Sequence, residues 1–296
     1  MSDVRLASGD ARLVLAKLGA EARAWSVGGV DLLWPGHSSI WREISPILFP
    51  IVGWLRDGAR VNGMRYGLGL HGFARRMTFE VQRQMRDSVR FVARDDQTTR
   101  IVYPFVFALA VEYRLTEDAL EIVLEVKNTG SKPMPYACGL HPGFNWPLGT
   151  AARAGARVRF AEAERAEVPV IAPGGLFSSE MRPIPLDGRA LPLDDDLFLQ
   201  EALCFLNAAS RSLRFEQADG SGVEMTLDGF PHIALWSRPG APFLSLEAWT
   251  GYGDPQGFAG DLFAKPSMRV LAPGESARHA EQLRHLPPLE ASHATA

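Results

Sequence analysis

The sequence predicts an all-β fold, a large antiparallel β-sandwich with few short helices. The main observation is a hydrophobic period of two, because apolar and polar residues alternate in many short runs. The second is dense turn chemistry, since 28 glycines and 21 prolines separate those runs. The third is the scarcity of helical patterns, which disfavours a Rossmann-like sheet or a TIM barrel. Two packed antiparallel sheets agree with all three observations.

The clearest element is a hairpin between residues 105 and 126. In "FVFALAVEYRL", alternate residues from Phe105 to Leu115 are apolar and share one face. After the turn "TEDA", the same alternation continues from Leu120 to Val126, with charged residues on the opposite face. Shorter runs that predict further strands lie at residues 11–19, 78–84, 88–95, 222–228, 232–238 and 241–249.

Two segments suggest short helices, at residues 37–46 and within residues 194–210. We see no internal repeat and no low-complexity linker. We therefore expect one sandwich domain over residues 1–285, followed by a loose C-terminal tail over residues 286–296.

Composition places the chain among ordinary soluble globular proteins, with 296 residues, 46% hydrophobic and 22% charged content. The net charge is −3 and both signs are mixed throughout, so we expect no nucleic-acid partner and no membrane partner. A small-molecule partner remains open, with the protein as a monomer or a homodimer. Cys138 and Cys204 read as buried, reduced thiols. With no apolar leader and no long apolar run, cytoplasmic is the expected location.

Three short stretches contain residues suited to chemistry. His71 and Arg75 lie at the start of a strand, after a glycine-rich approach that lets backbone come close to a ligand. His141 precedes Pro142, which biases its backbone toward extended geometry and so directs the imidazole. Taken separately, each stretch is also compatible with a packed histidine at a turn. Phe144 and Trp146, just beyond, are candidates for an apolar wall against a sugar ring.

Glu247 is the third candidate. In "APFLSLEAW", Leu244, Leu246 and Ala248 share the core face, so Glu247 projects to the opposite face beside Phe243 and Trp249. Burial among aromatic rings raises the pKa of a carboxylate toward that of a useful base. An edge-strand glutamate without a chemical role is the alternative.

These stretches occur in an order that resembles the aldose 1-epimerase (galactose mutarotase) superfamily, most of all its LacX-like branch. The matching motifs, from about Leu13 to about Gln282, are "SPILFPIVGWL", "HGFAR", "GLHPGFNWP", "LEAWTGYGDPQGF" and "LAPGES". The resemblance implies a galactose mutarotase-like supersandwich with a carbohydrate cleft on one sheet. It also implies that His141 is the general acid, that Glu247 is the general base and that His71 hydrogen-bonds the sugar. Trp249 and Arg75 are expected to contact the substrate.

The sequence departs from the family pattern at two places. Where the family has an arginine after "FPIVG", this chain has Trp54, and Arg56 is a candidate to stand in because it lies on the same face of an extended segment. The family's substrate-binding aspartate also has no single match in this sequence. Among Asp195, Asp196 and Glu201, we favour Asp196.

The implied reaction is the interconversion of α and β anomers through ring opening. A histidine with a reference pKa of about 6.5 suits the acid role, and a desolvated glutamate suits the base role. We expect no cofactor and no metal. A metal site built from His71, His141 and a carboxylate is disfavoured because no paired histidine or cysteine spacing is present.

Two other functions stay open. The first is a hexose-6-phosphate 1-epimerase, in which arginines clamp the phosphate. The candidates are Arg42, Arg65, Arg75 and Arg76. The second is a carbohydrate-binding protein with little turnover, which Trp54 in the arginine position favours.

Overall fold

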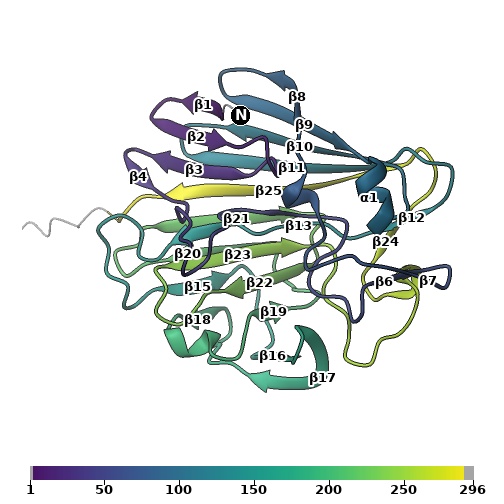
Figure 1. The fold of residues 1–296 in the computed structure, drawn as a ribbon. Coiled ribbons are helices and arrows are strands. Elements are labelled where there is room, and N and C mark those ends of the chain that lie inside the picture. Colours follow the sequence, from purple (N-terminus) through teal and green to yellow (C-terminus); the bar gives the residue numbers. More distant parts are fainter. Residues whose placement is uncertain (1–2, 290–296) are drawn as a thin grey trace, which may run out of the picture.

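The computed structural model describes residues 3–289 and consists mainly of antiparallel sheets (Figure 1). The largest sheet has nine strands. Their order is β18 (Ala190–Pro192), β15 (Arg157–Phe160), β20 (Ser212–Glu216), β21 (Gly222–Asp228), β25 (Ser276–Leu286), β11 (Ala119–Asn128), β10 (Phe107–Leu115), β9 (Ser88–Arg94) and β8 (Glu80–Gln84). Strands β10 and β11 form the predicted hairpin, with Phe107 opposite Asn128 and Leu115 opposite Leu120.

A second sheet of six strands packs against the first and carries the functional site. Its order is β19 (Leu203–Phe205), β22 (His232–Trp236), β23 (Phe243–Trp249), β13 (Gly139–Leu140) and β5 (Ile47–Leu48), with β14 (Gly143–Asn145) also paired to β23. One apolar core joins the inner faces of both sheets. It includes Leu109 and Leu124 from the large sheet and Leu244 and Leu246 from the small one. The predicted two-layer sandwich is therefore confirmed.

Smaller sheets complete the fold. They are the four-stranded sheet β1 (Val4–Ser8), β2 (Ala11–Leu15), β3 (Ala22–Val27) and β4 (Val30–Asp31), and the pairs β6 (Ala59–Val61) with β7 (Met64–Tyr66), β12 (Met134–Tyr136) with β24 (Arg269–Leu271), and β16 (Glu167–Ala172) with β17 (Leu176–Pro183). Strands β1 and β2 pack against β10, and the hairpin β16–β17 lies at the lower edge of the view in Figure 1. The hairpin also contributes residues to the wall of a cavity.

Helices are short. They are α1 (Gln97–Val102) and the 3₁₀ turns η1 (Ala74–Arg76), η2 (Asp195–Phe198) and η3 (Leu262–Ala264). The turn η2 agrees with the helical signal after residue 194, but the helix expected at residues 37–46 is absent. There the backbone N–H groups of Ile44 and Ser45 donate to Glu21 Oε1, at 2.8 and 3.1 Å, so a tertiary contact replaces the helical bonds. All helices within residues 3–289 are too short to span a lipid bilayer.

The C-terminal strand extends beyond the expected domain boundary. β25 continues to Leu286, and the N–H of Leu289 donates to the carbonyl oxygen of Asp219 at 2.9 Å. The first residues of the expected tail are thus attached to the large sheet. Residues 290–296 lie outside the part of the chain that the structure describes.

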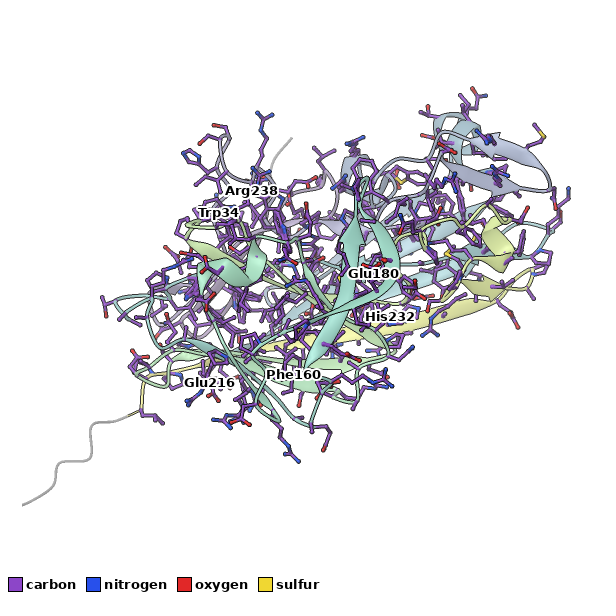
Figure 2. All side chains as sticks on the ribbon, turned by 90° about the horizontal axis from the view of Figure 1, so that it is seen from below. Trp34, Phe160, Glu180, Glu216, His232 and Arg238 are labelled. Carbon is purple, nitrogen blue, oxygen red and sulfur yellow. The ribbon has the colours of Figure 1, made fainter. Side chains whose placement is uncertain are left out.

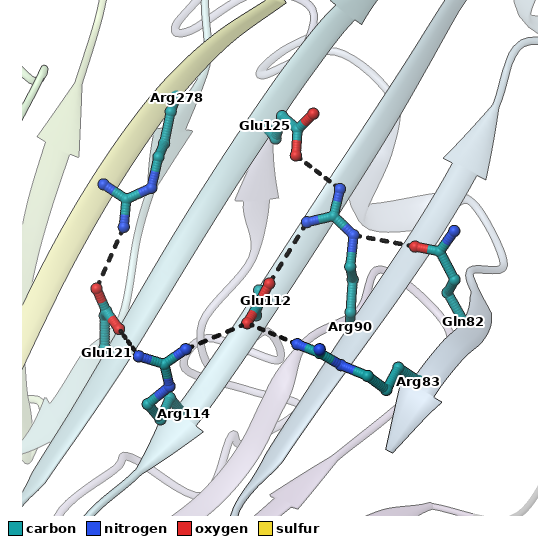
Figure 3. Close-up of polar contacts among 8 residues, drawn as sticks. All are labelled: Gln82, Arg83, Arg90, Glu112, Arg114, Glu121, Glu125 and Arg278. Carbon is teal, nitrogen blue, oxygen red and sulfur yellow. Dashed lines mark hydrogen bonds and ion pairs between the residues drawn. The ribbon is translucent and has the colours of Figure 1, made fainter. Parts of the chain in front are cut away.

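The outer face of the large sheet is covered by charged side chains (Figure 3). Arg90 lies between two glutamates, 2.6 Å from Glu125 and 3.4 Å from Glu112. Arg114 connects Glu112 to Glu121, at 3.6 Å from each. This face is polar and carries charges of both signs in ion pairs, and none of these five residues lines the cavity on the six-stranded sheet.

Candidate active site

A cavity of about 630 Å³ opens beside the six-stranded sheet and contains the predicted histidines and glutamate. Its volume falls within the range of about 300–1,000 Å³ that small-molecule sites occupy. His71, His141, Glu247, Arg75 and Trp249 all line it. Figure 2 views the molecule from below, with the hairpin that contains Glu180 in front and Arg238 near one edge.

His141 and Glu247 meet because two short strands pair with the same long one. β13 and β14 both bond to β23, and the His141–Pro142 segment interrupts the ladder between them. This interruption directs the imidazole toward β23, so His141 Nε2 lies 3.2 Å from Glu247 Oε2. Residues about a hundred positions apart in the sequence therefore form one buried pair.

Ser245 orients the imidazole of His141. The Ser245 side chain is completely buried on β23, and its Oγ lies 2.8 Å from His141 Nδ1. Because the Ser245 hydroxyl donates its single hydrogen to the Pro142 carbonyl at 3.0 Å, it accepts from Nδ1–H. The tautomer assigned in this way leaves Nε2, the nitrogen facing Glu247, as the position that gains and loses a proton.

Burial determines the protonation of this pair. It lowers the pKa of His141 to about 3 and raises the pKa of Glu247 well above its usual value, although the Trp249 indole N–H bonded to Glu247 at 3.0 Å acts the other way. The raised pKa of Glu247 agrees with expectation, whereas the pKa of His141 lies well below the reference value of about 6.5 because the imidazole is buried. Burial disfavours the imidazolium and the carboxylate individually, and ionisation of both together is favoured by their mutual attraction at 3.2 Å and by the Trp249 N–H. The pair therefore holds one proton at neutral pH.

His71 is a neutral hydrogen-bond donor toward the cavity. Its Nδ1 accepts the backbone N–H of Gly53 at 3.1 Å, which places the ring hydrogen on Nε2. Burial lowers the pKa of His71 well below its usual value, and His141 and Arg75 add to this effect. The backbone of His71 has φ +57°, a conformation that costs about 1–3 kcal/mol for a residue other than glycine and is concentrated at functional sites.

Arg75 adds a fixed positive charge. Its side chain is only 10% exposed, pairs with Glu43 at 2.9 Å and donates to the Leu70 carbonyl at 2.9 Å. Its Nε is buried and has no hydrogen-bond partner among the described residues. Arg75 and His71 thus both line the cavity from positions four residues apart in the chain.

The aromatic walls come from residues other than those expected. Phe144 and Trp146 are fully buried in the core and do not line the cavity. Trp41 and Trp236 do, with ring centroids 5.0 and 5.8 Å from that of His141. The expectation that Phe144 and Trp146 form the wall is wrong because the chain after His141 returns to the core. Trp54, 44% exposed, forms another wall.

Two predicted substrate-binding residues do not reach the cavity. Asp196 is exposed on η2, and Arg56 lines a separate small hollow while its backbone N–H donates to Asp254 Oδ2 at 2.8 Å. Glu201, from the same acidic segment as Asp196, lines the cavity instead. The spacing of three acidic residues in one loop does not reveal which of them turns inward.

The arginines near the cavity differ from those proposed as a phosphate clamp. Arg75 and Arg76 line it, Arg42 and Arg65 do not, and Arg238, which no sequence signal singled out, does. Arg76 and Arg238 are exposed and form no ion pair with any of the described residues. Nor do His, Cys, Asp and Glu side chains, within residues 3–289, gather in threes as metal ligands would.

The fold and the site together define a β-sandwich protein with a tryptophan-lined cavity around a buried imidazole–carboxylate pair. The chain belongs to the aldose 1-epimerase family, whose model matches residues 2–284. It therefore belongs to a family of carbohydrate epimerases, and the resemblance seen in its motifs is confirmed.

Individual relatives agree with this assignment. The chain is 30% identical over 262 residues to Protein LacX of Lactococcus lactis subsp. lactis, in both its chromosomal and plasmid forms, covering 84% of this chain and 88% of LacX. A galactose mutarotase related enzyme from Lactobacillus acidophilus has a similar structure, with a TM-score of 0.90 at 27% identity over 98% of this chain and 99% of that one. A galactose mutarotase-like protein from Lactobacillus casei has a TM-score of 0.89 at 26% identity, over 96% of this chain and 100% of that one.

Proposed function

We propose that the protein is an aldose 1-epimerase that interconverts the α and β anomers of a hexose or a related sugar. The observation that carries the proposal is the 3.2 Å contact between His141 Nε2 and Glu247 Oε2 on the wall of the cavity. The two oxygens that exchange protons in this reaction, the ring oxygen and the C1 hydroxyl, are bonded to one carbon. An acid and a base that act on them must therefore be neighbours.

The reaction uses one proton on the pair. With that proton on His141 Nε2, the Glu247 carboxylate takes the proton of the C1 hydroxyl while the C1–O5 bond breaks. The electron pair of that bond goes to O5, which takes the proton from Nε2. The products are an open aldehyde, a neutral His141 and a protonated Glu247.

Reclosure reverses these transfers. Rotation about C1–C2 presents the other face of the aldehyde to the O5 hydroxyl. O5 attacks C1 and returns its proton to His141, and the carbonyl oxygen takes the proton of Glu247. Sugar hydroxyls that donate to Glu247 favour its charged form at the start of the cycle. His71 Nε2–H and Arg75 are donors suited to the sugar hydroxyls.

Exchange NMR on the anomers of glucose and galactose tests the proposal. Glu247→Gln and His141→Ala are each expected to lower kcat/KM by roughly 10²–10⁴. The double variant is expected to lose about as much as the more damaged single variant, because the two groups act as a unit. Glu121→Gln, on the outer face of the large sheet, is the matched control. Full activity in both single variants would show that the pair is not catalytic.

A hexose-6-phosphate 1-epimerase is the second candidate. Arg76 and Arg238 favour it, because two guanidinium groups at the cavity without a carboxylate partner in the described chain suit a phosphate. Adding glucose 6-phosphate to the same panel decides between the two. A kcat/KM that is higher for the phosphate and falls in Arg238→Gln identifies the phosphosugar as the substrate. Sugar binding without any turnover would instead identify a carbohydrate-binding protein.

A further inference from the structure

Trp54 is an exposed indole whose backbone is firmly held. The N–H of Asp254 donates to the Trp54 carbonyl at 2.8 Å. Asp254 also accepts the backbone N–H of Arg56 and pairs with Lys265 at 2.9 Å, with the Lys265 and Asp254 side chains 1% and 5% exposed. The side chain is therefore presented to the cavity from a segment that a buried ion pair stabilises. Exposed aromatic side chains on a firmly held backbone are typical binding anchors.

The hairpin β16–β17 is shaped to fit this indole. Gly175, at its turn, has φ +73°, and a Cβ atom there would lie 2.0 Å from Trp54 Cδ1. Only glycine lets the turn lie against the ring. The turn end of the hairpin is attached to the same segment, because the N–H of Phe177, which pairs with Ile171 next to the turn, donates to the Asp254 carbonyl at 2.9 Å. Trp54 and the hairpin thus form one continuous wall.

This wall is distinct from the aromatic wall beside the catalytic pair. Trp41 and Trp236 contact His141 and belong to an apolar cluster around Phe243. Ile171 and Phe177, which also line the cavity, belong to a different cluster, one that includes Trp249, the residue bonded to Glu247. Trp54 makes no ring contact with His141, Trp41 or Trp236 in the described structure. The cavity therefore has two aromatic surfaces, one formed by Trp41 and Trp236 at His141 and one formed by Trp54 with the hairpin.

We propose that Trp54 forms a second sugar subsite, so that the substrate is a disaccharide or longer saccharide with a free reducing end. The inference rests on the proposed function, which places the reducing-end ring over His141 and Glu247. Anomer exchange needs only a free C1 hydroxyl on that ring, so a second ring attached at another hydroxyl is compatible with the chemistry. The apolar C–H face of the second pyranose stacks on the Trp54 indole.

Glu201 supplies the polar part of this subsite. It lines the cavity just before β19, a strand that packs against β16 of the hairpin. Its backbone is in the left-handed region at φ +67°, and Arg182 donates to its carbonyl at 3.4 Å. Its carboxylate has no ion-pair partner among the described residues and is free to accept from sugar hydroxyls.

The test compares sugars of one and two rings. KM is measured for glucose, galactose, maltose, cellobiose and lactose with the wild type, Trp54→Ala and Trp54→Phe. Trp54→Ala is expected to raise KM for at least one disaccharide about tenfold, the typical cost of truncating an aromatic anchor, and to change KM for the monosaccharides less than about twofold. Trp54→Phe is expected to retain most of the affinity. Phe263→Ala, which removes an exposed aromatic ring outside the cavity, is the matched control.

Methyl glycosides have no free C1 hydroxyl, so their rings cannot open and they cannot be epimerised. Their binding therefore tests the second subsite independently of the proposed activity. Calorimetry with methyl β-lactoside and methyl β-galactoside reports the subsite even if no sugar is turned over. Tighter binding of the lactoside that is lost in Trp54→Ala supports the second subsite. Equal losses for one-ring and two-ring ligands would place Trp54 against the same ring as the catalytic pair and overturn the inference. Failure of every disaccharide to bind would overturn it as well.

Discussion

Glu281 lies in the middle of β25 and has no role in the proposed reaction. Its side chain is fully buried, and neither carboxylate oxygen has a hydrogen-bond partner among the described residues. Its neighbours across the sheet are Ile122 and Leu227. Because nothing compensates for the lost solvation, burial raises the pKa of Glu281 to about 8.

The raised pKa makes stability depend on pH. Between about pH 4.5, the usual value, and about pH 8, the folded protein binds one proton more than the unfolded chain at this site. The free energy of unfolding therefore decreases as pH rises through this window. The stabilisation is fully present below about pH 4.5 and is lost as pH approaches 8. At about 1.4 kcal/mol per pH unit, the full loss is about 5 kcal/mol.

Glu281→Gln has nearly the same shape and never ionises. We expect the wild type to lose stability relative to this variant as pH rises, by up to about 5 kcal/mol. Urea unfolding followed by circular dichroism at pH 5, 7 and 9 measures the difference. Glu121→Gln removes a carboxylate from the outer face of the same sheet and reports the effect of a lost surface charge. Curves for the wild type and Glu281→Gln that stay parallel to within about 1 kcal/mol would refute the reasoning.

The remaining predictions concern the cavity and its support. Since burial lowers the pKa of His141 to about 3 and raises that of Glu247, the pair keeps its single proton, and kcat/KM is expected to stay level through pH 6.5. A titration near pH 6.5 in the pH–rate profile would contradict this. Lys265→Met leaves the charge of Asp254 buried and unpaired. We therefore expect the free energy of unfolding, measured with urea, to decrease by about 3–5 kcal/mol. A loss below about 1 kcal/mol would show that the pair is not structural.

Much of the fold follows from local pattern. The alternation in residues 105–126 predicts the β10–β11 hairpin because a half-buried strand needs one apolar face, and that requirement is visible in the sequence. The helical signal at residues 37–46 is misleading for the opposite reason. Its backbone donors bond to Glu21, a residue 23 positions before Ile44, and no local pattern reports such a partner.

The candidate site was predicted in part. Motifs indicated His71, His141, Arg75, Glu247 and Trp249, and all five line the cavity. Their catalytic and binding roles remain predictions. Cavity residues that lie on loops could not be identified from the sequence, because the direction of a loop depends on its packing. For that reason Arg238 and Trp41 were missed.

The amino-acid sequence alone determined the class of fold and the family, because period-two alternation, turn residues and ordered motifs are local properties. Only the tertiary structure decided which loop residues line the cavity and how burial shifts the pKa of its titratable groups. It placed Glu201 rather than Asp196 at the cavity, showed Trp54 exposed on the cavity wall, and lowered the pKa of His141 by burial. Desolvation and the direction of a loop both depend on atoms far away in the chain, so they appear only once the chain has folded.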